Sequence, residues 1–178
     1  MKKVVLTFGF LSGGLSALMM CGTLPFMEKI GYDRGLIVGY TAIVISFLFV
    51  YFGIRSYRDN VLGGRISFGR GLAVGLLITL ISCACYVAAW QILYRNFMPD
   101  FMDKFNAQML NELKSSGASE AEVQAAAQEG EKFKILLANP LINIAFTLIE
   151  PLPVGLLITF ISAAVLRRKQ GGPPVAAL

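Results

Sequence analysis

One acidic residue, Glu150, lies inside a long apolar stretch, and its type and position suggest chemistry more strongly than those of any other residue. If a helix begins near Pro140, Glu150 lies about 15 Å along it, close to the middle of a bilayer. A charged carboxylate is unfavourable there, so we expect the protonated acid. Because intramembrane acids often mark proton or ion sites, Glu150 is the candidate functional residue.

Pro151 and Pro153 follow Glu150 and interrupt the pattern of helical hydrogen bonds. Each proline removes a backbone donor and frees a carbonyl group one turn earlier. A protonated Glu150 could donate to such a carbonyl, or to a serine hydroxyl near the middle of another predicted span. These candidate midplane partners are Ser16, Ser46 and Ser82.

Two interpretations of Glu150 follow from this setting. In the first, Glu150 is a proton or cation site at a broken helix, as in many transporters. In the second, it is a neutral acid that satisfies the proline kink and joins the helices. Proton coupling predicts that Glu150→Gln abolishes function, whereas the structural role predicts that this substitution is tolerated.

The composition excludes most other site chemistry. The 178 residues include no histidine and three cysteines, which rules out a histidine general base and a Cys/His zinc cluster. The cysteines are interpreted as small apolar fillers. One glutamate without a second acid or a basic partner is too little for a hydrolase site, so we expect no enzyme, no cofactor and no metal.

Four apolar segments must position Glu150. The chain is 56% hydrophobic and 15% charged, whereas soluble domains carry about 25% charged residues. Each segment is close to the roughly 20 residues that a spanning helix needs. We predict an all-α four-helix membrane bundle forming one domain over residues 1–170, followed by a disordered tail at 171–178. The predicted spans are residues 4–27, 36–54, 69–95 and 140–166.

The first segment has two interpretations, a retained helix and a cleaved signal peptide. We favour the helix, because the apolar run exceeds the roughly 7–15 residues of a signal peptide.

The distribution of charge predicts the topology. The N-terminus, the second loop and the tail carry nine basic residues and one acid, whereas residues 95–134 carry five basic and seven acidic residues. Because basic loops stay in the cytoplasm, we predict an inner-membrane protein with both termini cytoplasmic. The basic excess is explained by topology and anionic lipid, so no nucleic-acid partner is expected.

Residues 97–138, between the third and fourth spans, are predicted to form an extracytoplasmic helical hairpin. Gly117 breaks the first helix, and Ser119 with Glu122 forms a capping box for the second. Asn139 then caps the helix that restarts the chain as the fourth span. In one interpretation the hairpin lies on the outer leaflet or caps the bundle, and in the other it docks an envelope protein. We favour the first interpretation. Its first helix is amphipathic, with an apolar stripe at four-residue spacing: Phe101, Phe105, Met109 and Leu113.

Small residues at four-residue spacing recur in the spans and favour close helix packing. Residues 74–82 read VGLLITLIS and residues 154–162 read VGLLITFIS, so eight of nine positions match. Because the third and fourth spans run in opposite directions, the echo is either an inverted repeat of the transporter kind or shared small-residue packing. We favour shared packing.

The end of the second span carries Arg55, Arg58 and Asp59 at the predicted inner face. They could form a small ion network, or they could serve only to anchor the helix at lipid headgroups and set the topology, which we favour. With these residues in view, the chain resembles the uncharacterised bacterial membrane proteins grouped as domain of unknown function 4199. The resemblance implies a four-span protein and no established activity. It rests on GIRSYRDN at 53–60, GGRISFG at 63–69 leading into Val74-Gly75, Pro99-Asp100-Phe101, Asn139-Pro140, Glu150 and Pro153-Val154-Gly155.

Two functional hypotheses remain. The first, which we favour from the sequence, is a non-enzymatic structural or accessory component of a membrane assembly. The second is a proton- or cation-coupled small transporter that uses Glu150. The expected partners are the lipid bilayer and either a second copy or another membrane protein. The transporter predicts a cavity that reaches Glu150, whereas an accessory subunit should co-purify with its partner.

Overall fold

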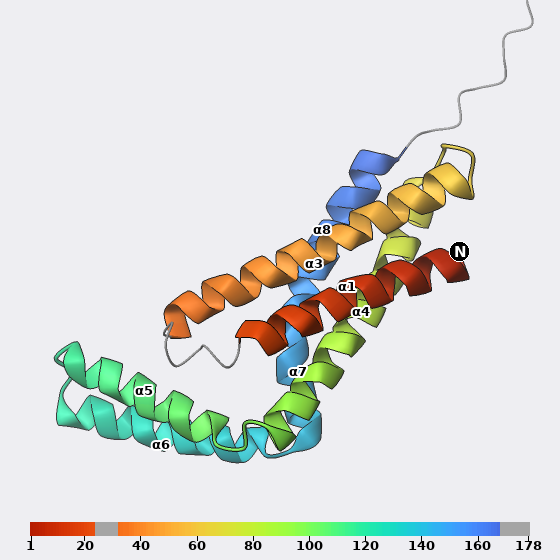
Figure 1. Ribbon diagram of the computed structural model, residues 1–178. Coiled ribbons are helices and arrows are strands. Elements are labelled where there is room, and N and C mark those ends of the chain that lie inside the picture. Colours follow the sequence, from red (N-terminus) through yellow and green to blue (C-terminus); the bar gives the residue numbers. More distant parts are fainter. Residues whose placement is uncertain (24–31, 168–178) are drawn as a thin grey trace, which may run out of the picture.

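The computed structural model describes residues 1–23 and 32–167, and every regular element within them is an α-helix (Figure 1). Four helical stretches are long and apolar enough to cross a membrane, and we call them the span-like helices. They confirm the predicted all-helical class. The last four residues of the first predicted span and the predicted tail lie outside the described residues. The helices are α1 (Lys2–Thr23), α3 (Tyr32–Asn60), α4 (Phe68–Asn96), α5 (Phe101–Ser115), α6 (Glu120–Leu137), α7 (Pro140–Ile149) and α8 (Pro151–Leu166).

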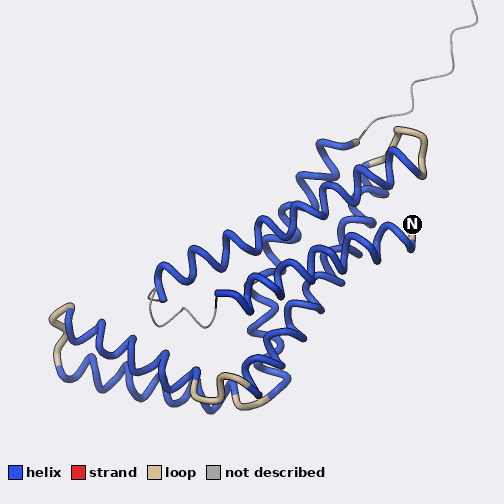
Figure 2. The backbone as a smooth tube through the Cα atoms, in the orientation of Figure 1, coloured by secondary structure: helices blue, strands red, loops and turns tan. Residues whose placement is uncertain are grey.

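The second helix is longer than the predicted span. It continues through the charged residues after Ile54 and ends at Asn60, because charge ends an apolar run without ending a helix. Ser67 then caps α4 by accepting a hydrogen bond from the backbone N–H of Arg70 at 3.4 Å. Short loops join the other helices of the described ranges (Figure 2).

The span-like helices gather in one bundle, in which α1 packs on α3 and α4, and both of these pack on α8 (Figure 1). Ser12 of α1 joins three helices. Its hydroxyl lies 2.8 Å from the backbone oxygen of Ser46 in α3 and 2.9 Å from the hydroxyl of Ser82 in α4. Hydrogen bonding of this kind links helices where hydrophobic burial gives little drive for association.

The repeated segments of α4 and α8 pack against each other, with the helices running in opposite directions. A Cβ atom added to Gly75 would lie 2.6 Å from Thr159, and one added to Gly155 would lie 2.6 Å from Thr79. The two threonine hydroxyls are hydrogen-bonded to each other at 2.9 Å. The two copies of the nine-residue echo therefore contact each other reciprocally through their glycines and threonines.

Helices α5 and α6 lie side by side and extend away from one end of the bundle (Figure 1). Gly117 has a φ of 86°, which ends α5 and turns the chain. Ser119 and Glu122 form the capping box that opens α6. Gly130 of α6 lies directly against Asn106 of α5, because a Cβ atom added there would meet its amide group at 3.0 Å.

Candidate functional site

Glu150 lies at the one-residue break between α7 and α8. Its φ of −73° and ψ of −60° remain in the right-handed helical region, so the break bends the chain without reversing it. Pro151 is buried and begins α8, where its missing N–H removes the bond to the carbonyl of Thr147. Pro153 is exposed. The predicted pairing of an acid with a proline-interrupted helix is therefore present.

The half-buried Glu150 side chain is held by Tyr86 of α4, whose hydroxyl donates to Glu150 Oε2 at 2.7 Å. Tyr86 is buried, so this contact is fixed by the packing of α4. The other carboxyl oxygen, Oε1, has no hydrogen-bond partner among the described residues. A Cβ atom added to Gly39 would lie 3.9 Å from Oε1, so this oxygen faces the glycine of α3.

The three serines predicted as partners of Glu150 make other contacts within the described residues. Ser46 donates to the carbonyl of Ala42 at 2.8 Å, and Ser82 bonds to Ser12. Ser16 donates to the carbonyl of Gly13 at 2.9 Å, although it lines a cavity that Glu150 also lines. A serine hydroxyl in a helix commonly donates to the carbonyl three or four residues earlier, as Ser16 and Ser46 do here. Tyr86 is therefore the side chain that bonds the carboxyl group of Glu150.

Two cavities meet at Glu150. The first, about 220 Å³, lies between α4, α5, α6 and α7, and we call it the α6-side cavity. The second, about 190 Å³, lies between α1, α3, α4 and α5, and we call it the α1-side cavity. Five residues line both cavities: Tyr86, Trp90, Phe101, Phe105 and Glu150.

Aromatic rings from α4 and α5 form the shared wall. Trp90 stacks on Tyr94 with ring centroids 5.6 Å apart and meets Phe101 edge-on at 5.3 Å. Phe133 of α6 and Phe146 of α7 also line the α6-side cavity and meet edge-on at 5.2 Å. The first two residues of the apolar stripe predicted for residues 101–113, Phe101 and Phe105, therefore pack at the end of the bundle and line both cavities.

A hydrogen-bonded amide pair, of which Asn143 is buried and Gln91 half-buried, attaches α7 to α4 beside this wall. Gln91 donates from its side-chain nitrogen to Asn143 Oδ1 at 2.6 Å. Asn143, which is 4% exposed, donates in turn to the carbonyl of Leu137 at the end of α6. These bonds join three of the helices that line the α6-side cavity and set the position of α7 ahead of Glu150.

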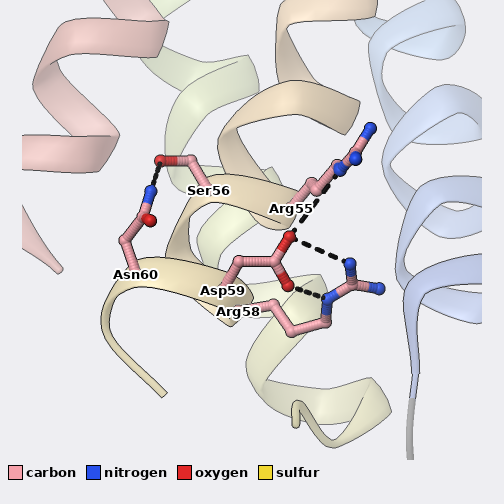
Figure 3. Close-up of polar contacts among 5 residues, drawn as sticks. All are labelled: Arg55, Ser56, Arg58, Asp59 and Asn60. Carbon is pink, nitrogen blue, oxygen red and sulfur yellow. Dashed lines mark hydrogen bonds and ion pairs between the residues drawn. The ribbon is translucent and has the colours of Figure 1, made fainter. Parts of the chain in front are cut away.

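The predicted charge cluster forms at the other end of the bundle, in the last turns of α3 (Figure 3). Arg58 Nε donates to one oxygen of Asp59 at 2.6 Å, and its Nη2 donates to the other at 3.1 Å. Arg55 Nε lies 3.7 Å from Asp59 Oδ2, and Asn60 donates to Ser56 at 3.1 Å. Glu150 faces Gly39 near the start of α3, whereas the cluster lies at the end of that helix. Its charged side chains are suited to anchoring the helix end at a charged surface.

Tyr86 and Trp90 are the site residues that sequence reasoning missed. Their spacing of four residues, continued by Tyr94, places all three on one face of α4. That aromatic stripe could have indicated the face of α4 that lines the site. The sequence of an apolar helix does not show, however, which of its faces packs against another element. Within the described ranges, no group of three or more Cys, Asp or Glu side chains is placed to hold a metal ion.

The four span-like helices and the acid at the helix break define a helical bundle whose long helices can cross a membrane. The chain belongs to the family described as "Protein of unknown function (DUF4199)", which it matches over residues 7–168. This assignment confirms the resemblance drawn from the sequence motifs. No curated protein and no solved structure matches the chain.

Proposed function

We propose that this protein is a small proton- or cation-coupled carrier of the bacterial inner membrane, with both termini in the cytoplasm, and that Glu150 is its coupling group. The observation that carries the proposal is that Glu150 lines two cavities, one bounded by α6 and α7 and the other by α1 and α3, which share a wall formed by α4 and α5. A carrier needs a titratable group that pathways can reach from more than one direction.

The contacts of Glu150 support this role over a purely structural one. A structural acid would be expected to use both carboxyl oxygens in bonds to the protein. Here Tyr86 bonds Oε2, whereas Oε1 has no hydrogen-bond partner among the described residues. One oxygen thus orients the carboxyl group and leaves the other to bind a proton or cation.

Trp90 provides a direct test, because it is the single tryptophan of the chain and lines both cavities with Glu150. We expect its fluorescence in lipid nanodiscs to change with pH as Glu150 takes up a proton. Glu150→Gln should abolish this change, and the matched variant Glu129→Gln on the exposed face of α6 should retain it. A Glu150→Gln protein that titrates like the wild type would refute the proposal.

The second candidate is the accessory component of a membrane assembly. The observations that favour it are the extension of α5 and α6 away from the bundle and the exposed apolar residues Phe133, Ile135 and Leu136 at the end of α6 that leads into α7. Affinity purification in mild detergent tests it. A stoichiometric partner that is lost when Ile135 and Leu136 are replaced by serine would favour this candidate.

A further inference from the structure

We infer that the α6-side cavity takes a small organic monocation, an alkylated amine or a quaternary ammonium group, with Glu150 as its counterion. This inference rests on the proposed function and names its substrate class. It is carried by the meeting of one carboxyl group with a wall of aromatic rings at the helix break.

The rings supply the first part of the recognition. The ring centroids of Trp90, Tyr94 and Phe101 lie within 6.4 Å of one another, and Phe133 of α6 and Phe146 of α7 add two further rings to the lining. The face of an aromatic ring is electronegative and attracts a cation within about 6 Å of its centroid. A lining of several aromatic rings is typical of sites that recognise quaternary ammonium groups, which carry charge without hydrogen-bond donors.

The charge supplies the second part. Among the described residues that line the cavity, Glu150 is the only carboxyl group, and none is lysine or arginine. When Glu150 is ionised, an anion would meet a like charge and no basic partner, whereas a monocation would meet one counterion and take the place of the proton. The balance of charge selects a single positive charge.

The oxygen atoms argue against a metal ion as the occupant. Calcium takes about 6–8 oxygen ligands. Besides Glu150, the polar lining groups are largely engaged, because Asn143 accepts from Gln91 and Thr147 donates to the carbonyl of Asn143 at 2.7 Å. A quaternary ammonium group needs no such ligands.

The volume limits the size of the occupant. The cavity measures about 220 Å³, below the roughly 300–1,000 Å³ of pockets that hold drug-sized ligands. It therefore suits a compact head such as tetramethylammonium or the trimethylammonium group of choline.

The test is the binding of tetramethylammonium and choline to the protein in phosphatidylglycerol nanodiscs, followed through Trp90 fluorescence. The matched control ligand is 3,3-dimethylbutan-1-ol, which has the shape of choline without its charge. We expect choline to bind at least about tenfold more tightly than this alcohol, and acidification to weaken choline binding. Equal binding of the two ligands would overturn the inference.

Two variants check the assignment of residues. Glu150→Gln should remove the preference for choline over the neutral alcohol. Phe101→Leu should weaken choline binding about 3- to 30-fold, and this variant also serves if Glu150→Gln fails to fold. Choline binding that is unaffected by both folded variants would overturn the inference.

Further measurements distinguish a lipid-borne cation from a free one. They also distinguish a failure of this inference from a failure of the proposed function. If phosphatidylcholine nanodiscs reproduce the fluorescence change and compete with free choline, the cation is the head group of a lipid. If they do neither, the cation is a free solute. Both results support the inference. A pH response without choline binding overturns the inference and leaves the proposed function. Choline binding that does not depend on pH overturns proton coupling.

Discussion

Two adjacent glycines of α1, Gly13 and Gly14, should respond differently to the same substitution by alanine. A Cβ atom on Gly13 would lie 2.5 Å from Cys85 Cβ, 2.9 Å from its sulfur and 3.2 Å from Ser82 Cα. A Cβ atom on Gly14 would have nothing within 4 Å. Gly13→Ala must therefore push α1 away from α4, whereas Gly14→Ala adds a methyl group to an open face.

The difference between the two variants isolates the packing contribution. Overpacking of a tight interface costs about 1–3 kcal/mol, and both variants share the roughly 1 kcal/mol by which alanine exceeds glycine in helix preference. Separation of the helices would also lengthen the 2.9 Å bond between Ser12 and Ser82, and membrane hydrogen bonds contribute about 0.6 kcal/mol on average. We expect Gly13→Ala to be about 1–3 kcal/mol less stable to unfolding than Gly14→Ala.

The assay is reversible unfolding of each variant in mixed detergent micelles, with helix content followed by circular dichroism. The double variant Gly13→Ala with Cys85→Gly should recover part of the lost stability, because the closest contact is to Cys85 Cβ. Equal free energies of unfolding for the two single variants would refute the argument that α1 and α4 meet through Gly13.

The remaining predictions concern a buried hydroxyl pair and an exposed helix cap. Thr79→Val and Thr159→Val should show a coupling free energy of about 0.6 kcal/mol, and at most about 1.7, in a double-mutant unfolding cycle; strict additivity would contradict the hydrogen bond between them. The backbone N–H of Ser119 lowers the pKa of Glu122 below its ordinary value of about 4.3. The cap should therefore be complete above that value and be lost as the pH falls through the lower pKa of the folded state, with faster amide exchange at the start of α6. Glu122→Gln should remove this pH dependence and Glu120→Gln should keep it.

Structural features that depend only on residues close together in the chain could be predicted from the sequence. The four span-like helices follow from the length of the apolar runs. The caps at Ser119 and Asn139 follow from side chains that satisfy the first backbone N–H groups of a helix. The contacts of Arg55 and Arg58 with Asp59 are local in the same way, because all three lie in two turns of one helix.

The partners of Glu150 were not accessible in this way. Serines near the middle of other spans were reasonable candidates, but Ser16 and Ser46 bond to carbonyls of their own helices and Ser82 bonds to Ser12. Tyr86 reaches the carboxyl group because α4 packs beside α7 and α8, and a tyrosine extends far enough to cross that interface.

The sequence by itself determined the helices, their caps, and the presence of an acid followed by two prolines in an apolar segment. Only the tertiary structure decided that Glu150 meets Tyr86, that α5 brings Phe101 and Phe105 over Trp90, and that two cavities share this wall. The physical reason is that helix formation depends on residues within about four positions. The face that an apolar helix turns to its neighbours depends on the shapes of distant segments, which small-residue packing brings together.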